Sequence, residues 1–292
     1  MKQLEAKIIE NKSLARGFYK MRLGSAYLAK NSKPGQFVEI KCSEGGEVLL
    51  RRPLGVHRIL NGGIEVLYKV IGKGTELLSR KRPGDTVDVI GPLGNGFSIK
   101  RNTNDKRRTT VLVAGGIGVA PLVALAESLV HSSKLIVHSK RKKIYVLIGA
   151  CKKGHVLCVN DFKKLGAEVI VYTEDGFLGK KGLVTDGLNS LLSTINYELS
   201  TIYACGPAAM LKTIAKIAEA KRVPCQVSME ERMACGVGVC LGCPIKVHTT
   251  STQYAIPRTT HFVRARGRRN TQYAYKMACK DGPVFNAKEI VW

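Results

Sequence analysis

The sequence predicts a multidomain fold with three parts: an antiparallel β-barrel (residues 1–100), an α/β Rossmann-like domain (residues 101–226) and a small cysteine-rich module (residues 227–292). Three observations predict this division. Short alternating runs punctuated by turn residues fill the first part, strand-like runs alternate with helical stretches in the second, and closely spaced cysteines mark the third. A chain of 292 residues is also long enough for two domains and a short appended module.

The composition favours an ordinary packed protein. Hydrophobic residues make up 45% of the chain, which supports packed cores and argues against extensive disorder. The N-terminus mixes charged and apolar residues and does not have the pattern of a secretory signal. The longest uncharged run, from Thr109 to Ala126, is interrupted by glycines and a proline, so a buried strand, a turn and a helix explain it better than a membrane span. We expect a soluble, cytoplasmic protein without a membrane partner.

The charge and the cysteines bear on partners and compartment. The formal net charge is +25, from 47 basic and 22 acidic residues, which would suit nucleic acid or an anionic membrane. A lysine-rich solvated surface explains the same charge, and we expect no nucleic-acid partner. Nine cysteines without an extracellular signal indicate a reducing compartment rather than a disulfide framework.

The first part carries the pattern of a barrel. Residues 37–41 and 64–70 alternate apolar and polar side chains, and turn signals recur at residues 33–35, 61–63 and 82–85. Many short strands with such punctuation favour an antiparallel barrel of about 100 residues.

Two motifs in this part are typical of phosphate binding. Residues 50–55 (Leu-Arg-Arg-Pro-Leu-Gly) follow a strand-like run, and an arginine at the end of a barrel strand can pair with a phosphate through its guanidinium group. An exposed basic turn would be the simpler explanation if this motif stood alone. It is joined by residues 72–75 (Gly-Lys-Gly-Thr), which resemble a second phosphate cradle, and by Tyr68, which a half-buried strand position explains equally well.

The second part has the alternating texture of a parallel sheet. It follows a charged linker at residues 100–108. Strand-like runs occur at residues 110–114, 144–149, 167–172 and 201–204, and helical stretches run to Val130 and over residues 208–221. Strands that alternate with helices indicate a sheet covered on both faces.

A glycine-rich turn in the second part is suited to a pyrophosphate. Gly115, Gly116 and Gly118 lie between a strand and a helix, where small residues let the backbone approach phosphate and the helix N-terminus favours its negative charge. A structural tight turn is an equal explanation. Residues 173–176 and 204–207 also follow or end strands, so we expect them at the same carboxyl edge of the sheet, where doubly wound folds bind ligands.

The cysteines near the C-terminus are the most specific motif. Cys235, Cys240 and Cys243 have the C-x4-C-x2-C spacing of plant-type 2Fe–2S ligation, and Cys279 can supply the fourth thiolate. The glycines between them let the backbone curl tightly and point its N–H groups at the cluster. Zinc would also accept four thiolates, but its usual spacing has two C-x2-C pairs and here there is one, so we favour the iron–sulfur cluster.

Together these motifs resemble the ferredoxin reductase superfamily, and within it the electron-transfer subunits of type B dihydroorotate dehydrogenases. The resemblance covers essentially the whole chain. The most specific matches are residues 230–243 (Glu-Glu-Arg-Met-Ala-Cys-Gly-Val-Gly-Val-Cys-Leu-Gly-Cys) and residues 279–285. Further matches are residues 50–53, 91–97, 113–122 and 205–207.

The resemblance implies a FAD-binding barrel, a NAD-binding domain and a 2Fe–2S module. It assigns FAD contacts to Arg52, Pro53, Leu54, Gly55, Leu67, Tyr68, Lys69, Gly74 and Thr75. The expected NAD contacts are Gly115, Gly116, Gly118, Pro121, Cys205, Gly206 and Pro207. The expected cluster ligands are Cys235, Cys240, Cys243 and Cys279. We assign no catalytic residue.

The resemblance also implies a partner and a reaction. In that family the subunit joins a separate FMN-containing catalytic subunit that oxidises dihydroorotate to orotate in pyrimidine biosynthesis. Electrons pass from FMN through the cluster to FAD, and then as hydride to NAD⁺. The chain is therefore expected to be an NAD-dependent oxidoreductase subunit in a heterotetramer with two copies of each subunit.

Two features depart from the family pattern. Gly55 stands where the family carries a serine whose hydroxyl reaches the flavin, so that hydrogen bond is missing or is supplied by a backbone N–H. Thirty-five residues, more than is usual, separate Cys243 from Cys279. Residues 244–278 carry basic charges and no acid, at Lys246, Arg258, Arg264, Arg266, Arg268, Arg269 and Lys276. This stretch is either a solvated surface loop or a docking arm for an acidic partner.

Two other functions remain in view. Related FAD and iron–sulfur subunits serve NAD(P)H-dependent reductases that act on ferredoxin or sulfur compounds, but their first cluster ligand is often Asp, so Cys235 favours the dihydroorotate branch. A zinc-dependent nucleic-acid-binding protein would fit the charge and the cysteines, but it leaves the barrel and the glycine-rich domain unexplained. The choice between NAD and NADP, the physiological donor and the stoichiometry stay open at this point.

Overall fold

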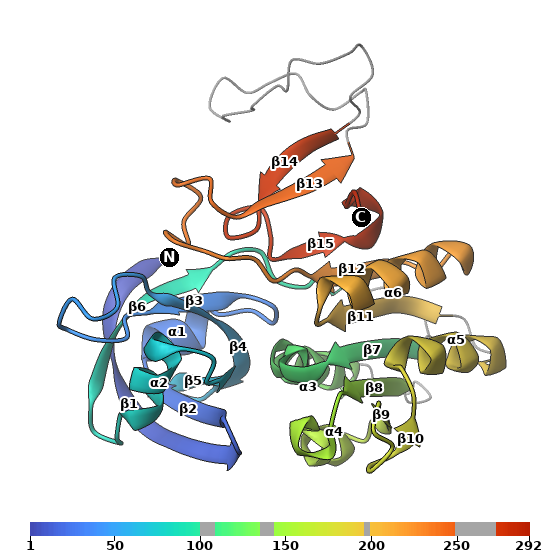
Figure 1. The fold of residues 1–292 in the computed structure, drawn as a ribbon, viewed down its shortest axis with the longest axis horizontal. Coiled ribbons are helices and arrows are strands. Elements are labelled where there is room, and N and C mark those ends of the chain that lie inside the picture. Colours follow the sequence, from blue (N-terminus) through green and yellow to red (C-terminus); the bar gives the residue numbers. More distant parts are fainter. Residues whose placement is uncertain (100–108, 135–142, 196–198, 249–272) are drawn as a thin grey trace.

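The computed structural model describes residues 1–99, 109–134, 143–195, 199–248 and 273–292. Figure 1 shows three parts: a barrel formed by the N-terminal strands, a layered α/β part beside it, and a C-terminal part that rests against both. None of the described helices combines the length and the apolar character needed to span a bilayer. The multidomain fold predicted from the sequence is confirmed.

The N-terminal part is a closed antiparallel barrel. Its strands run in the order β1-β2-β5-β4-β3-β6, which confirms the predicted architecture. The strands are β1 (Lys2–Ala15), β2 (Phe18–Gly24), β3 (Phe37–Ile40), β4 (Arg52–Leu60), β5 (Gly63–Lys69) and β6 (Thr86–Leu93). Two short helices, α1 (Ala26–Asn31) and α2 (Lys73–Arg80), connect some of them.

Alternation along the strands separates the barrel core from an outer face. Val38 and Ile40 of β3 and Leu54 of β4 pack in the barrel core. Because successive side chains of a strand point to opposite sides, their neighbours in sequence point outward. Phe37, for example, packs in a core that it shares with the C-terminal part. The outer face of β3 is therefore covered by the C-terminal part at this position.

The α/β part is built on a seven-stranded sheet in the order β10-β9-β8-β7-β11-β12-β15. Its strands are β7 (Thr109–Gly115), β8 (Ile144–Ala150), β9 (Glu168–Thr173), β10 (Lys180–Lys181), β11 (Leu199–Cys205), β12 (Cys225–Ser228) and β15 (Val284–Asn286). All neighbours from β10 to β12 pair in parallel, and β15 pairs antiparallel with β12. The four strands predicted for this part are confirmed.

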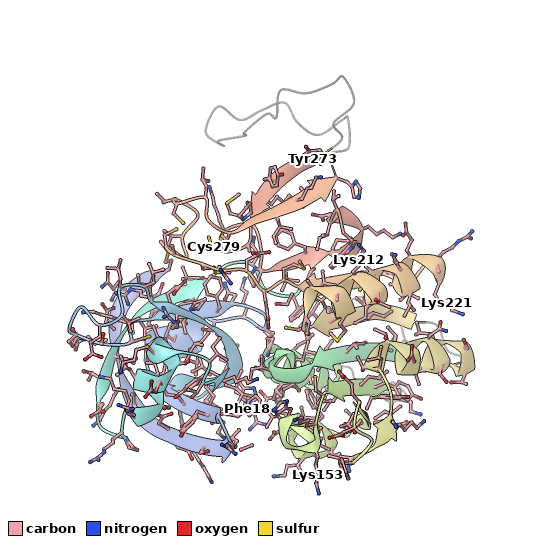
Figure 2. All side chains as sticks on the ribbon, viewed as in Figure 1. Phe18, Lys153, Lys212, Lys221, Tyr273 and Cys279 are labelled. Carbon is pink, nitrogen blue, oxygen red and sulfur yellow. The ribbon has the colours of Figure 1, made fainter. Side chains whose placement is uncertain are left out.

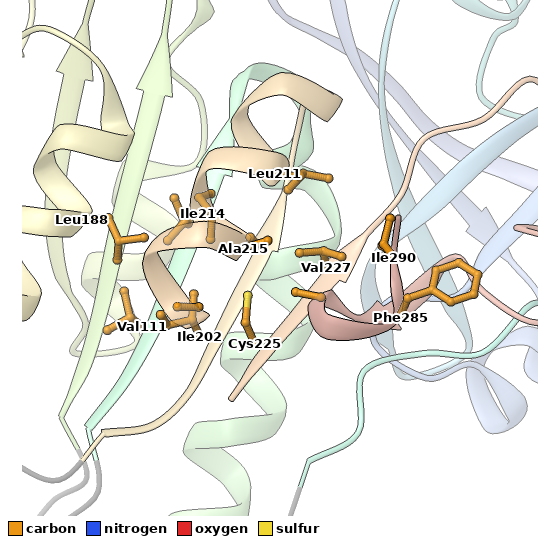
Figure 3. Close-up of a cluster of buried hydrophobic side chains, with 14 of the residues drawn as sticks. Val111, Leu188, Ile202, Leu211, Ile214, Ala215, Cys225, Val227, Phe285 and Ile290 are labelled. Atoms are coloured by element: carbon orange, nitrogen blue, oxygen red, sulfur yellow. The ribbon is translucent and has the colours of Figure 1, made fainter. Parts of the chain in front are cut away.

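Helices cover both faces of this sheet, as the alternating texture predicts. They are α3 (Ala120–Lys134), α4 (Val159–Lys164), α5 (Val184–Thr194) and α6 (Ala208–Ala220), with the short 3-10 turns η1 (Gly116–Val119) and η2 (Lys153–His155). Val111 of β7 belongs to one core with Leu188 of α5 and Ile214 of α6 (Figure 3). Leu112, the next residue, belongs to another core with Leu122 of α3. Burial on both faces explains the uninterrupted apolar run of β7.

The C-terminal part is a hairpin that returns to the sheet. β13 (Pro244–His248) and β14 (Tyr273–Met277) pair antiparallel, and η3 (Ala287–Glu289) follows β15. Both ends of the basic stretch are thus strands rather than loop. Lys246 Nζ lies 3.8 Å from the centroid of the Tyr273 ring, and Lys276 Nζ pairs with Glu289 at 2.8 Å. The remaining basic side chains of the stretch lie outside the described residues: Arg258, Arg264, Arg266, Arg268 and Arg269.

Polar contacts of β4 hold the barrel against the α/β part. The buried His57 donates from Nδ1 to the carbonyl oxygen of Ala120, at 2.8 Å, because a carbonyl can only accept. The guanidinium group of Arg58 pairs with Glu127 at 3.0 Å and with Asp161 at 2.9 Å. These contacts reach helices α3 and α4, so β4 is oriented relative to the sheet edge.

Candidate functional site

Arg52 and the start of α2 form a candidate phosphate site. Arg52 opens β4, so the prediction that residues 50–55 follow a strand is wrong, because a loop precedes them; Arg52 nevertheless lies at one end of a barrel strand. A Cβ built on Gly74 would lie 2.7 Å from Arg52 Nε, so the guanidinium group packs directly on this glycine. The N-terminal N–H groups of α2 and the arginine thus face the same space, an arrangement that suits the diphosphate of FAD.

The outer face of β4 leaves open space beside Gly55. Leu54 points into the barrel core, so Pro53 and Gly55 on either side of it point outward. The nearest atom to a Cβ built on Gly55 is Cβ of Pro121, at 4.0 Å. The predicted FAD strand and the predicted nucleotide contact Pro121, at the start of α3, therefore lie side by side.

The predicted FAD contacts on β5 and α2 divide between two sides. Tyr68 is buried in the barrel core, where its hydroxyl donates to Asn11 Oδ1 at 3.1 Å and burial raises its pKa. A contact of Tyr68 with FAD would therefore run through its backbone. The Thr75 hydroxyl is hydrogen-bonded within the turn before α2. Leu67 and Lys69 point out of the barrel, toward the α/β part.

The two glycine-bearing turns meet at the carboxyl edge of the sheet, as predicted. The residues at these turns are Gly115, Gly116, Gly118, Cys205, Gly206 and Pro207. A Cβ built on Gly118 would lie 2.4 Å from the carbonyl oxygen of Cys205, and one built on Gly206 would lie 3.0 Å from Cα of Gly115. Only residues without side chains permit this approach, so the turns form one continuous surface.

A cavity of about 460 Å³ opens at this edge, between the sheet and the barrel. Its lining includes Gly115, Gly116 and Pro207 from the two turns, and Phe18 and Lys69 from the barrel. Figure 2 labels Phe18 where the two parts meet. A concave site of this size suits a small molecule or one end of a nucleotide.

Sequence reasoning missed several residues of this cavity. Phe18 and His155 approach edge to face, with ring centroids 5.5 Å apart, and both line it. Cys151, at the end of β8, also lines it and donates to Glu174 Oε1 at 3.2 Å. Only Glu174 lies in a segment predicted for this edge. A lone aromatic, histidine or cysteine carries no local pattern that would have revealed the others.

Cys205 is enclosed beneath the turns. Its side chain is 4% exposed, and burial raises its pKa to about 12. A neutral thiol in such surroundings packs as a small hydrophobe.

The four predicted cluster ligands fall into two pairs. Cys243 Sγ lies 3.3 Å from Cys279 Sγ. Cys235 Sγ accepts backbone N–H bonds from Val237 at 3.4 Å and from Cys240 at 3.5 Å. Within the described ranges, no three His, Cys, Asp or Glu side chains are grouped as ligands of one metal ion would be. Two pairs of thiols are the donor set of a cluster with two irons, so the residues fit a 2Fe–2S centre.

Backbone N–H groups near Cys235 stabilise the thiolate form of its side chain. Burial opposes the charge, but backbone N–H bonds from Cys240 and Val237 outweigh it and lower the pKa of Cys235 to about 6. Burial and the neighbouring sulfur of Cys243 raise the pKa of Cys279 to about 12. Cys279 is thus a ligand that loses its proton to a bound metal rather than to water.

Glu39 is a buried acid beside the loop at residues 229–243, which carries Cys235, Cys240 and Cys243 and is called the cysteine loop below. The sequence does not reveal that Glu39 is buried. The side chain is 0% exposed, and burial raises its pKa to about 7 against the opposing charge of Arg51. In the sequence, Glu39 occupies the polar position of an alternating strand, which normally faces water. The C-terminal part covers this face of β3, and that cover comes from residues almost 200 positions away.

Two family models match the chain. That of the oxidoreductase NAD-binding domain matches residues 112–216, which include the glycine turns and the sheet edge. That of the iron–sulfur cluster binding domain of dihydroorotate dehydrogenase B matches residues 230–256, which include Cys235, Cys240 and Cys243.

Whole-chain relatives agree with these matches. The dihydroorotate dehydrogenase B (NAD(+)) electron transfer subunits of Desulforamulus reducens and Geobacillus sp. are 35% and 36% identical, over 100% of this chain and 99% of each relative. A solved NADH-dependent reduced ferredoxin-NADP oxidoreductase is similar with a TM-score of 0.77 and 30% identity, over 98% of this chain and 90% of that chain. An Amycolatopsis cytochrome P450 reductase, 22% identical over 76% of this chain and 66% of that chain, shares the fold with a TM-score of 0.61.

Proposed function

The chain belongs to the family of dihydroorotate dehydrogenase B electron transfer subunits, and we propose that it passes electrons from dihydroorotate oxidation by a partner, through a 2Fe–2S cluster and FAD, to NAD⁺. The observation that carries the proposal is one arrangement around the paired strands β3 and β4: the cysteine loop lies against Glu39, the start of α3 lies beside Gly55, and Arg52 at the start of β4 packs on Gly74. FAD, when bound, exchanges hydride with a nicotinamide and single electrons with a cluster.

The chain's own residues bind and orient these groups. We assign residues 1–100 to the FAD domain, 101–226 to the NAD domain and 227–292 to the cluster module. Arg52 and the N-terminus of α2 hold the diphosphate of FAD, while the backbone of β4 and β5 supports the rest of it. The turns at Gly115 and Gly206 hold the nucleotide diphosphate at the sheet edge. The start of α3 lies next to Gly55 of β4, so the proposed FAD and NAD sites adjoin each other there.

The cysteine loop is suited to contact a partner protein. Cys240 is exposed, and so are its apolar neighbours Val239 (78%) and Leu241 (41%). Exposed apolar side chains beside a redox centre suit a protein interface, because a partner excludes water there and shortens the path for electrons. We propose that an FMN-containing catalytic subunit docks here, in a heterotetramer with two copies of each subunit. All nine cysteines are free, which fits a cytoplasmic, reducing compartment.

The basic stretch (residues 244–278) gives a prediction about that docking. Five of its seven basic residues lie outside the described residues, so its role as a docking arm stays a sequence-based prediction. If it steers an acidic partner, the association rate falls steeply between low and high salt, and a charge-reversed stretch loses that dependence. Stopped-flow association with the catalytic subunit measures this. A rate insensitive to both salt and charge reversal would reject the docking arm.

An anaerobic absorption spectrum of the purified full chain, followed by titration with NADH, tests the proposed function. Flavin bands with an iron–sulfur shoulder, both bleached by NADH, are expected. Addition of the catalytic subunit and dihydroorotate should then reduce NAD⁺. A colourless protein that holds zinc and no flavin would overturn the proposal.

A second candidate is supported by the solved relative of 30% identity, which is a reduced ferredoxin-NADP oxidoreductase. On that alternative the subunit would serve a ferredoxin-linked reductase. The same titration separates the two, because ferredoxin and not the dihydroorotate-oxidising subunit would then restore electron flow.

A further inference from the structure

Glu39 lies at the junction between the barrel and the cysteine loop. It stands in β3 between Val38 and Ile40, whose side chains fill the barrel core, so its own side chain points to the outer face. Its partner across the strand pair is Pro53 of β4, a proposed FAD contact. The acid is therefore beside the strand that would hold FAD.

The cysteine loop covers this acid directly. A Cβ built on Gly236 would lie 2.6 Å from Glu39 Cγ and 2.9 Å from Glu39 Oε1. Gly236 adopts a φ of +69°, which favours glycine, and its missing side chain leaves room for the acid. Gly236 follows Cys235, so the carboxyl group touches the turn that carries the first cluster ligand.

The surrounding arginines are engaged elsewhere. The guanidinium group of Arg51 donates to the carboxylate of Asp88 at 2.6 Å, and that of Arg52 donates to the carbonyl of Leu50 at 2.7 Å. Neither carboxylate oxygen of Glu39 has a hydrogen-bond partner among the described residues. Burying an acid is costly, and an apolar side chain would fill the same space at lower cost. The role of the acid therefore lies in what it touches, which is the loop.

We propose that Glu39 is a positioning residue for the 2Fe–2S cluster: its enclosed carboxyl group packs against the turn at residues 235–237 and holds the loop on the FAD-binding face of the barrel. The inference rests on the proposed function, which supplies the cluster. Groups outside the ligand set orient the ligands, and hydrogen bonds around them tune the centre. Because β3 pairs with β4, the same group also sets where the loop lies relative to FAD.

The test compares iron retention and the electron paramagnetic resonance spectrum of the reduced cluster in the full-length protein. Glu39→Leu removes the polar carboxyl group and keeps the bulk, and we expect it to lose iron to a chelator about tenfold faster, with a changed spectrum. Glu39→Gln keeps both the size and a polar group at the end of the side chain and should stay close to wild type. The matched control is Glu65→Leu: Glu65 is also buried in the barrel, at 5% exposure, but pairs with Lys20 at 3.3 Å, away from the loop.

The outcomes separate this inference from the proposed function. Wild-type iron loss and an unchanged spectrum in Glu39→Leu overturn the positioning role alone. Equal acceleration in Glu65→Leu overturns it too, because the effect would then reflect barrel stability. If Glu39→Leu does not fold, Glu39→Ala adds no bulk beneath the loop and supports the same comparison. A wild-type protein without iron would overturn both the proposed function and this inference.

Discussion

Gly55 shows how a single missing side chain alters a flavin site without altering the fold. Its backbone is extended within β4, and the nearest atom to a built Cβ is 4.0 Å away. Serine therefore fits there with ordinary van der Waals contact, and its hydroxyl would point to the outer face beside Pro121. The residue is a place where the redox behaviour of FAD can be changed independently of its binding.

We predict that Gly55→Ser leaves FAD bound and shifts the midpoint potential of the flavin. The added hydroxyl contributes a hydrogen bond of about 1 kcal/mol, which differs between oxidised and reduced flavin. Spectroelectrochemistry of the purified protein measures the shift. Gly45→Ser is the control, because a Cβ built on Gly45 meets no atom within 4 Å and the residue lies in an exposed loop. Loss of FAD from Gly55→Ser would contradict the prediction.

Two glycines of the cysteine loop differ in what lies opposite them. Gly236 and Gly238 both have positive φ, +69° and +81°. A Cβ on Gly236 would lie 2.6 Å from Cγ of the enclosed Glu39, and one on Gly238 would lie 2.7 Å from Cδ and 2.8 Å from Cβ of the exposed Lys280. Alanine therefore meets the same kind of backbone strain and a close contact at both positions, but the side chain that it crowds is buried only at Gly236.

We predict that Gly236→Ala lowers the iron content of the purified protein more than Gly238→Ala does. The backbone strain costs about 1–2 kcal/mol in both variants. Overpacking against Glu39 adds about 1–3 kcal/mol in the first, because a buried side chain cannot move aside. Colorimetric iron determination per chain decides it, and equal iron contents would show that Glu39 yields to the new methyl group.

At the scale of secondary-structure elements, the barrel strand β4 and the helix α2 act as one phosphate-binding unit. Arg52, at the start of the strand, packs on Gly74 in the first turn of the helix. Arg80, in the last turn, pairs with Glu76 and is exposed. The two arginines lie at opposite ends of the helix. Substituting each in turn therefore distinguishes the loss of a charge at the proposed phosphate site from a general loss of positive charge.

We predict that Arg52→Ala weakens FAD binding by about 10- to 100-fold, the effect of losing a charge-assisted hydrogen bond of about 1.5–3 kcal/mol. Titration of the FAD-depleted protein with FAD, followed by flavin fluorescence, measures the dissociation constant. Arg80→Ala should leave it unchanged. Similar weakening in both variants would place the diphosphate elsewhere.

Some of these elements and site residues could be predicted from the sequence, and others could not. Periodicity located the strands of the sheet, because β7 and its neighbours are buried on both faces and read as continuous apolar runs. Spacing located the cysteines, since a small cluster needs ligands close together in the chain. Glu39, Phe18 and His155 could not be found, because their surroundings are built by residues distant in sequence. The prediction that a strand precedes Arg52 was wrong, because the loop before it resembles the end of a strand in its sequence.

At the scale of the whole molecule, His57 links the barrel to the α/β part. Its ring is 2% exposed, and burial lowers its pKa below the ordinary 6.5, although the bond to the Ala120 carbonyl opposes the shift. The folded protein therefore takes up this proton less readily than the unfolded chain. The stabilisation is complete above about pH 6.5 and declines as pH falls below it.

We predict that His57→Gln reduces the loss of thermal stability between pH 7.5 and pH 5.5. Glutamine can still donate to the Ala120 carbonyl but does not titrate, so the cost of protonating a buried ring disappears. Melting temperatures at the two pH values measure the effect. The exposed His131→Gln is the control and should behave as wild type; a wild-type pH dependence in His57→Gln would remove His57 from the linkage.

The pairing of β15 with β12 has a consequence for how the protein is made. β15 follows the other described strands in the sequence, yet it completes the sheet beyond β12, and Cys279, which precedes it, lies beside Cys243. During synthesis the barrel and the other strands of the sheet can therefore fold before this edge closes. Cluster assembly belongs to the interval after Cys279 and β15 have emerged, when iron delivery finds the earlier domains already folded and one strand still to add.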